Sequence, residues 1–193
     1  MKRGDSTRER ILNAARAEFA EHGIAGARVD RIAAAAQANK AQLYTYFGNK
    51  SALFEAVFSI ALDSIVNTVP LDGEDLPGYA VRLYDEYLEN PELVRLATWA
   101  RLERRSVGHL TVDAESLDDA KLRAIEAGQK SGHIDPWFEP FDVLTTVIAI
   151  SMTWSPASAT FTATRDDDPE DHERRREVLR RIVGRAFPPP TRQ

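Results

Sequence analysis

The sequence predicts an all-α fold of about nine helices. Apolar residues recur at intervals of three and four along most of the chain, which is the spacing of one helix face. No segment shows the sustained alternation of apolar and polar residues that is typical of a half-buried strand. Three later helix starts share a capping residue followed by proline. These pairs are Asn90-Pro91, Asp135-Pro136 and Asp168-Pro169.

The first helix is predicted between a capping hydroxyl at Ser6 or Thr7 and a terminating Gly23. Its apolar stripe consists of Ile11, Leu12, Ala15 and Phe19. A second, short helix follows, and its inward residues are Val29, Ile32, Ala33 and Ala36. The start of this second helix is poorly capped, because Ala27 and Arg28 stand where Ser, Thr or Asp would accept a backbone hydrogen bond.

The third helix begins at Asn39 and shows a complete start signal. The Asn39 side chain can accept from the backbone N–H three residues along, and Gln42 stands where the reciprocal partner of a capping box belongs. Leu43 and Phe47 are four residues apart and form the inward stripe. Gly48 then allows the chain to turn.

Six further helices complete the prediction. The fourth is capped by Asn49 and stopped by Pro70, and its inward residues are expected to be Leu53, Val57, Ile60, Ala61 and Ile65. The remaining five are expected at 78–89, 91–105, 113–128, 136–155 and 169–187, the last one closed by Gly184 and the prolines from Pro188.

The second and third helices form a helix-turn-helix, because only Gln37 and Ala38 separate them before the Asn39 cap. The sequence therefore predicts a DNA-binding domain at 1–50, followed by a helical domain at 51–193. The charge distribution agrees with this division. Residues 1–50 hold nine Lys and Arg against five Asp and Glu, whereas residues 51–193 hold sixteen against twenty-five. A basic head on an acidic body indicates that only one end binds an anion.

The outward residues of the third helix have the chemistry of a DNA reader. Gln42 can pair with adenine, and Ala41 or the Thr45 methyl group can contact a thymine methyl group. Tyrosine hydroxyls and lysine ammonium groups can donate to phosphates, which fixes the register of the protein on the duplex. Alternatively, Tyr44 and Tyr46 simply cover the edge of a small core.

Residues from Thr7 to Phe58 resemble the DNA-binding domain of the tetracycline-repressor (TetR) family. The stretch ILNAARAEFAEHGIAGARVDRIAAAAQANKAQLYTYFGNKSALFEAVF carries the resemblance. It implies a homodimeric transcription factor, most often a repressor, that leaves its DNA operator when a small-molecule effector binds. The positions that it places at DNA are Arg28, Lys40, Ala41, Gln42, Tyr44, Thr45, Tyr46 and Lys50.

Two positions depart from the family pattern. Such proteins usually have glycine in the turn where this chain has Gln37, so the backbone there is expected to be less left-handed or mildly strained. They also commonly have threonine where this chain has Ala27 and Arg28, which puts the geometry of a phosphate contact at Arg28 in doubt.

The body is expected to supply a dimer interface and an effector pocket. In the family, the last two helices pair with those of a second subunit, although either can equally belong to the core of one subunit. The candidate interface residues are Val143, Val147, Val178, Leu179, Ile182, Val183 and Ala186. A mainly hydrophobic effector fits the large side chains of the central helices, each of which can also be ordinary core. These candidates are Tyr84, Tyr87, Leu96, Trp99, Leu102, Phe141, Met152 and Trp154.

Other functions find less support in the sequence. The four histidines show no metal-binding spacing, and there is no glycine-rich phosphate loop or nucleophile elbow, so neither an enzyme nor a cofactor or metal is expected. The uncharged run 143–164 contains Pro156 and many hydroxyl residues, which favours a buried helix and a loop over a membrane span. With no cysteine and no signal-peptide pattern, a cytoplasmic location is expected. The alternative to a regulator is a helical protein-interaction module whose helix-turn-helix is structural only.

Overall fold

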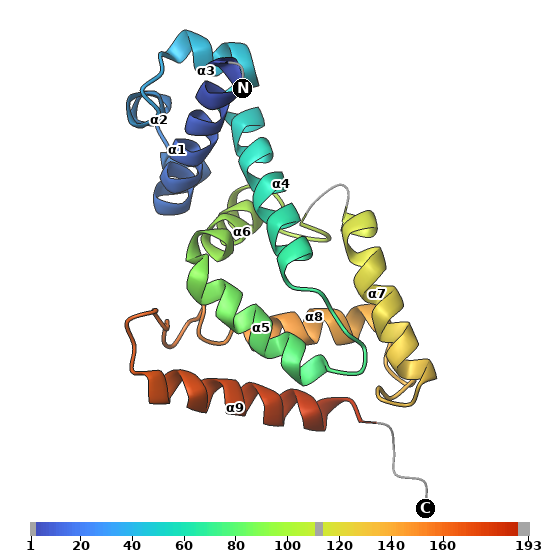
Figure 1. Cartoon of the computed structure of the whole chain (residues 1–193). Coiled ribbons are helices and arrows are strands. Elements are labelled where there is room, and N and C mark those ends of the chain that lie inside the picture. The colour runs from blue at the N-terminus through green and yellow to red at the C-terminus, as the bar shows by residue number, and fades with distance from the viewer. Residues whose placement is uncertain (1–2, 111–113, 189–193) are drawn as a thin grey trace, which may run out of the picture. The chain divides into compact units, whose positions relative to one another are not determined.

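The computed structural model describes residues 3–110 and 114–188, and over these residues it contains nine helices and no strand (Figure 1). The all-α prediction is therefore confirmed. The helices are α1 (Arg3–Gly26), α2 (Val29–Ala35), α3 (Lys40–Phe47), α4 (Lys50–Thr68), α5 (Leu76–Glu89), α6 (Pro91–Glu103), α7 (Ala114–Lys130), α8 (Pro140–Ser151) and α9 (Pro169–Ala186).

The chain divides into two compact units. The first comprises Met1–Ser64 and Glu92–Leu110, and the second Ile65–Pro91 and Thr111–Gln193. The predicted domain boundary at residue 50 coincides with the start of α4, whereas the compact units divide inside that helix. In the first unit α1 packs against α2 and α3, and α2 packs against α3. Its fully buried side chains include Ile11, Phe19, Ile32 and Leu43.

In the second unit α5 packs against both α8 and α9, and α7 packs against α8 (Figure 1). The core contains Tyr79, Leu83, Val143, Val147 and Leu179, each at most 1% exposed. Because α8 is apolar on almost every side, it needs cover from more than one neighbour, and α5, α7 and α9 provide that cover.

The predicted bounds of the last two helices differ from those in the structure. The helix expected to open at Asp135-Pro136 begins at Pro140, because the Asp135 side chain accepts the Trp137 N–H at 2.9 Å and closes a turn instead. It ends at Ser151 rather than Ser155. The last helix also continues through Gly184 and ends at Ala186.

One predicted core position of α4 is also wrong. Leu53, Val57 and Ala61 are buried, but Ile60 is 50% exposed. The side chain of Ile65, the last residue of the predicted stripe, lies outside the described residues. Phe54 and Phe58 are buried beside Leu53, Val57 and Ala61, so the buried face of α4 is turned away from Ile60.

Candidate nucleic-acid interface

The orientation of α3 is fixed by its cap and by two buried side chains. Asn39 Oδ1 accepts the Gln42 N–H at 2.8 Å, and Gln42 Oε1 accepts the Asn39 N–H at 3.0 Å, which confirms the capping box. Leu43 is fully buried and Phe47 is 9% exposed. The guanidinium of Arg8 lies 5.4 Å from the centre of the Phe47 ring and covers it. The other side chains of α3 must therefore point outward.

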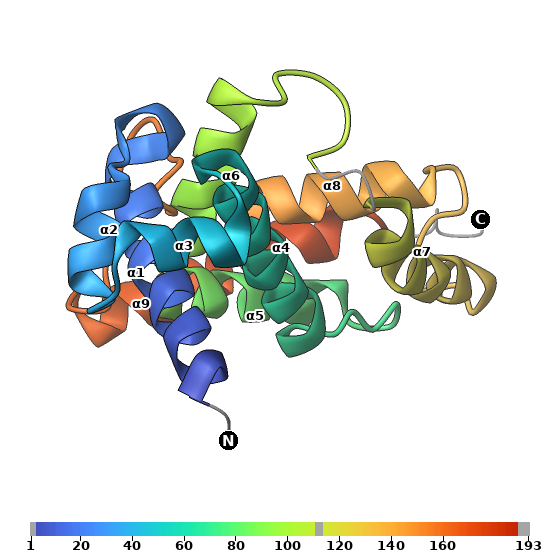
Figure 2. The same cartoon turned by 90° about the horizontal axis from the view of Figure 1, so that it is seen from above.

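The outward face of α3 carries the predicted DNA-contacting residues. Figure 2 looks onto this part of the first unit, where α3 follows α2 directly. Tyr44 is 46% exposed and Tyr46 is 39% exposed. Both rings are thus partly in solvent, which disfavours the alternative that they only cover the edge of a core. The exposed predicted residues on or next to this face are Arg28, Lys40, Ala41, Gln42, Tyr44, Thr45 and Tyr46.

Two of these side chains are held by neighbours within the unit. Lys40 Nζ lies 2.6 Å from Asp30 Oδ1, and this hydrogen bond raises the pKa of Lys40 above its ordinary value. Both side chains are more than half exposed, so the pair contributes little to stability and can yield to a phosphate. Thr45 Oγ1 donates to the Ala41 carbonyl at 2.8 Å, which leaves its methyl group free to turn outward.

Lys50 differs from Arg28 and Lys40 because it is half-buried, whereas they are exposed. Its ammonium group donates to the carbonyls of Ala25 and Ala27, at 3.1 Å each. These bonds attach the start of α4 to the connection between α1 and α2. An ammonium group has three N–H donors, so one remains for a phosphate. The structure thus gives Lys50 a positioning role that its place in the sequence does not reveal.

Glu18 is a positioning residue that the sequence did not identify. Its Oε1 accepts the Arg28 backbone N–H at 2.8 Å, and its carboxylate also pairs with Arg31. Arg28 is the N-cap of α2 and makes no side-chain capping bond, as its residue type predicts. Glu18 therefore satisfies an N–H at the start of α2 from α1. No local pattern reveals this contact, because ten residues separate the two partners.

The pKa of Glu18 is lowered from its ordinary value. Burial acts most strongly and raises it, but the hydrogen bonds from the Arg31 side chain and the Arg28 backbone, together with the charges of Arg31 and His22, outweigh burial. The carboxylate is thus ionised at neutral pH and holds the start of α2.

The turn of the helix-turn-helix retains the left-handed backbone that glycine would favour. The backbone of Gln37 has a φ of 50°. Among the residues that the structure describes, no other non-glycine residue has a positive φ. From the sequence, the backbone at Gln37 was expected either to be less left-handed than that of a glycine or to be mildly strained. The structure shows a left-handed residue, and a side chain in that conformation is strained by about 1–2 kcal/mol.

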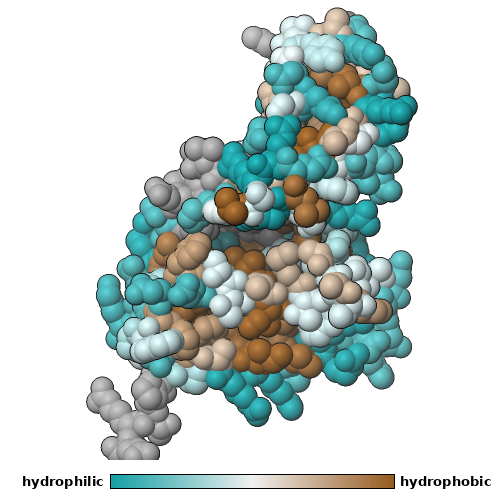
Figure 3. Space-filling view, turned by 180° about the vertical axis from the view of Figure 1, so that it is seen from behind, coloured by the Kyte–Doolittle hydropathy of each residue, from teal (hydrophilic) through white to brown (hydrophobic). Residues whose placement is uncertain are grey.

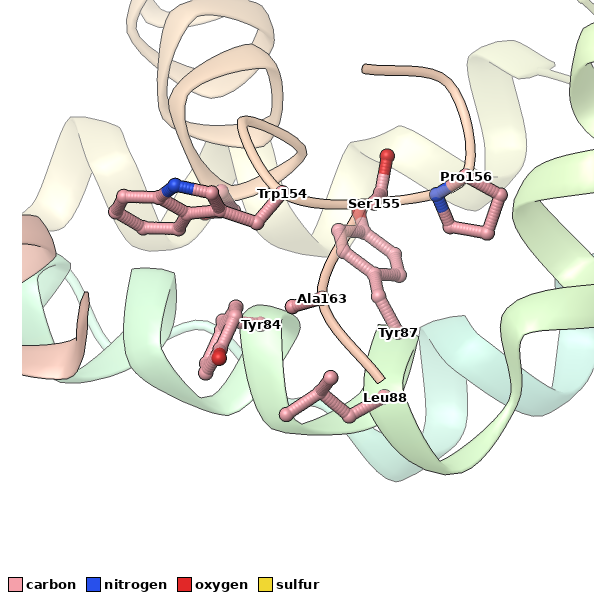
Figure 4. A pocket seen from close by; sticks show the side chains of 8 residues that line it. Tyr84, Tyr87, Leu88, Trp154, Ser155, Pro156 and Ala163 are labelled. Atoms are coloured by element: carbon pink, nitrogen blue, oxygen red, sulfur yellow. The ribbon is translucent and has the colours of Figure 1, made fainter. Parts of the chain in front are cut away.

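The residues predicted to contact an effector do not gather at one place. Tyr84, Tyr87 and Trp154 line one pocket in the second unit (Figure 4). Leu96, Trp99 and Leu102 lie on α6 in the first unit, where Trp99 Nε1 donates to the Ala20 carbonyl at 3.3 Å. Phe141 is 41% exposed on α8, and Met152 is half-buried just beyond it.

The pocket has an empty volume of about 190 Å³, part of which is open to solvent. Its walls come from α5, from the end of α8 with the turn that follows, and from the segment that leads to α9. Sequence reasoning missed five of its eight residues, because small side chains and proline carry no signal of their own. The lining residues are Tyr84, Tyr87, Leu88, Ser151, Trp154, Ser155, Pro156 and Ala163.

The predicted dimer residues fall into two groups. Val143, Val147, Leu179 and Val183 are at most 2% exposed, so they belong to the core of the subunit and are not available to a partner. The other group lies along one edge of α9 and reaches solvent. Val178 is half-buried, Ile182 is 47% exposed and Ala186 is exposed.

Two other kinds of site are absent from the described residues. Within 3–110 and 114–188, no group of His, Asp and Glu side chains is arranged to hold a metal ion. Among the helices of the same residues, none is long and apolar enough to cross a bilayer.

Two family models match the chain. The model of bacterial regulatory proteins of the tetR family matches residues 11–57, which include α2 and α3. The model of the tetracyclin repressor-like C-terminal domain matches residues 75–185, more than half of the chain.

Curated relatives and solved structures agree with these matches. The HTH-type transcriptional repressor SCO4008 of Streptomyces coelicolor is 40% identical over 149 residues, covering 76% of this chain and 77% of that protein. The HTH-type transcriptional repressor NicS of Pseudomonas putida is 31% identical over 145 residues, covering 68% and 67%. The crystal structure of the putative transcriptional regulator SCO4942 from Streptomyces coelicolor superposes with a TM-score of 0.81 at 40% identity, covering 95% of this chain and 99% of that one. These matches show that the chain belongs to the TetR family of helix-turn-helix transcriptional repressors.

Proposed function

We propose that this protein is a cytoplasmic, ligand-responsive repressor that binds a pseudo-palindromic operator as a homodimer through residues 39–47. The exposed polar face of α3 carries the proposal. Its cap and its two buried residues hold Gln42, Tyr44 and Tyr46 outward without help from DNA. A preorganised helix loses little conformational entropy on entering a major groove, so its contacts contribute fully to affinity.

Each contact has a role that follows from its chemistry. Gln42 reads a base edge, assisted by Ala41 and the methyl group of Thr45. Lys40, Tyr44 and Tyr46 donate to phosphates, and the remaining N–H of Lys50 adds to them. Arg28, exposed at the start of α2, contacts the backbone on the other side of the turn.

Homodimerisation is supported by an uncharged surface stripe on α8 and α9. Phe141, Thr145, Ile148, Ala149 and Met152 recur at helical spacing on the side of α8 opposite its buried residues. Figure 3 shows apolar surface gathered on the face of the second unit that includes α8. Together with Val178, Ile182 and Ala186 on α9, this stripe is a surface that a second copy would bury. A two-fold dimer would place its two α3 helices in successive major grooves, about 34–36 Å apart.

Effector response is supported by the aromatic pocket in the second unit. An effector releases DNA only if it binds the non-DNA-binding conformation more tightly than the DNA-binding one. The lining is mainly apolar, and none of its eight residues is charged, which suits a small, mainly hydrophobic molecule.

Selection of bound duplexes from a random DNA pool tests the proposal, followed by titration of the winning duplex at two salt concentrations. We expect an enriched pseudo-palindrome and an affinity that falls steeply with salt, since each neutralised phosphate adds about 0.9 to the slope of log affinity against log salt. No enrichment by folded protein would contradict operator binding and would favour a protein-interaction module.

A further inference from the structure

We propose that the pocket lined by Tyr84, Tyr87 and Trp154 binds a flat, uncharged aromatic molecule that offers one hydrogen-bond acceptor to the Tyr87 hydroxyl. The inference deepens the proposed function, on which it rests, by assigning a chemical class to the effector.

The Tyr87 side chain is buried and its hydroxyl is unused. Tyr87 is 7% exposed, and its hydroxyl has no hydrogen-bond partner among the residues that the structure describes. Figure 4 shows its ring reaching from α5 toward Ser155, across the pocket. The O–H donor of Tyr87 is therefore available, and a ligand acceptor at this point would give it a partner.

The neighbouring polar groups are already engaged. Tyr84 Oη lies 2.7 Å from His172 Nδ1, and Ser151 Oγ donates to the Val147 carbonyl at 2.8 Å. Ser155 Oγ accepts the Ala157 N–H at 3.2 Å and keeps its own proton to donate. The pocket therefore presents unused O–H donors, and a ligand must bring an acceptor to match them.

The pocket favours a neutral ligand. With no charged residue in the lining, a buried carboxylate or ammonium group would lose its hydration without gaining an ion pair. Burial raises the pKa of Tyr87 above its ordinary value, so the hydroxyl remains a protonated donor at neutral pH.

The walls favour a flat ring system. The Tyr84 and Trp154 rings meet edge to face, with centres 5.9 Å apart, and aromatic faces bind planar rings well. The empty space of about 190 Å³ includes open solvent, so the pocket suits one or two fused rings at most.

One wall must move when the ligand enters, because the space between the lining side chains is too narrow for a ring system as it stands. The segment that carries Ala163 is the wall that we take to move. Its attachment to the α8 side consists of the Ala163 N–H donating to the Trp154 carbonyl at 2.9 Å and Thr162 Oγ1 donating to the Ser155 carbonyl at 3.3 Å. Since this segment leads directly into α9, ligand entry would displace the chain next to the proposed dimer helix.

Calorimetric titration with three bicyclic probes tests the inference on the full-length chain. Quinoline has a ring nitrogen that accepts a hydrogen bond, naphthalene has the same shape without an acceptor, and 2-naphthoate is an anion. We expect quinoline to bind about tenfold or more tightly than naphthalene and than 2-naphthoate. Equal binding of quinoline and naphthalene, tighter binding of the anion, or binding of none of the three at millimolar concentration would overturn the inference.

The variants Tyr87→Phe and Tyr84→Phe form a matched pair, because both lose one pocket hydroxyl and keep the ring. Tyr87→Phe should abolish the preference for quinoline over naphthalene and leave the melting temperature unchanged or higher. Tyr84→Phe should keep the preference and lower the melting temperature, since it leaves His172 without its partner. A loss of stability in Tyr87→Phe as large as that in Tyr84→Phe would show that the hydroxyl is structural, against the inference.

Operator binding without any probe separates this inference from the proposed function. If the chain selects an operator but binds no quinoline, only the inference fails. If quinoline binds through Tyr87 and no duplex is selected, the pocket assignment holds and the repressor function fails. Release of the operator by quinoline, lost in Tyr87→Phe, would support both.

Discussion

The Gln42 side chain has two roles: it caps α3, and we propose that it also contacts DNA. Its Oε1 accepts the Asn39 N–H at 3.0 Å and so closes the cap of α3. An amide oxygen has two lone pairs, so the second one and both N–H donors remain for a base edge. The capping bond also immobilises the amide before DNA arrives, which lowers the entropic cost of the contact.

Gln42→Glu and Gln42→Ala should separate these two roles. Glutamate keeps the capping acceptor but loses the amide donors and adds a charge that phosphates repel, so we expect unchanged stability and an operator affinity lower by about tenfold or more. Alanine should lose affinity and also about 1 kcal/mol of unfolding free energy. Urea unfolding and anisotropy titrations on the selected duplex measure the two effects. Unchanged affinity in both variants would remove Gln42 from the interface.

The conformation of Gln37 is set by the turn and not by its residue type. The turn requires φ of 50°, and the chain accepts a side chain there at a cost in strain. The short connection between α2 and α3 leaves no other residue to take up the left-handed conformation.

Gln37→Gly should stabilise the protein by about 0.5–1 kcal/mol, because relief of strain exceeds the greater freedom of glycine in the unfolded chain. Ala38→Gly is the matched control, since Ala38 has no positive φ, and it should destabilise. Both are measured by urea unfolding. If the two glycines destabilised equally, the strain assigned to Gln37 would not exist.

At the scale of elements, the helices of the first unit hold one another by contacts to backbone groups. Glu18 of α1 accepts an N–H at the start of α2, Arg10 of α1 donates to the Ala36 carbonyl at its end at 2.9 Å, and Lys50 of α4 donates to the Ala25 and Ala27 carbonyls. These side chains satisfy groups that α2, only seven residues long, cannot satisfy by itself. Short helices can therefore keep a fixed orientation beneath the recognition helix.

Glu18→Gln should lower the unfolding free energy by about 1 kcal/mol at pH 7, because hydrogen bonds to an ionised carboxylate are stronger than those to an amide. The folded pKa of Glu18 lies below its ordinary value of 4.5, so its contribution is present above pH 4.5 and is lost as the pH falls through the folded pKa. Unfolding curves of both proteins from pH 7 to pH 3 should thus converge at the acid end. A difference that stayed constant with pH would mean that the charge of Glu18 has no part in it.

For the whole molecule, the proposed operator binding depends on pairing of two chains. One α3 contacts only one half-site, and linking two half-sites raises affinity through effective concentration without new contacts. We expect the two chains to pair through the stripe on α8 and α9. Its side chains are exposed or half-buried in a single chain although they are almost all apolar.

Ile182→Asp should weaken the dimer and, with it, operator binding. The Ile182 side chain is 47% exposed, so the substitution should leave the fold intact while placing a charge in the contact. We expect monomers in sedimentation velocity at micromolar concentration and an operator affinity lower by about a hundredfold. Arg180→Asp, on the opposite edge of α9, is the control and should remain dimeric. A dimeric Ile182→Asp variant with full affinity would exclude this face of α9.

The sequence by itself determined the all-α class, most helix boundaries in the first unit, the capping box of α3 and the face that α3 exposes. Each of these depends on residues at most four positions apart, since caps, turns and helical periodicity are local. The resemblance over Thr7 to Phe58 added the family, which the comparisons confirmed.

Only the tertiary structure decided which apolar residues meet. A helix that is apolar on nearly every side, such as α8, does not reveal which of its faces is covered, and here Val143 and Val147 proved to be core. The same holds for Glu18 beneath α2, for the turn at Asp135 that delays α8, and for the gathering of Tyr84, Tyr87 and Trp154 at one pocket. These contacts join residues distant in the chain, and their free energy depends on packing that no local pattern records.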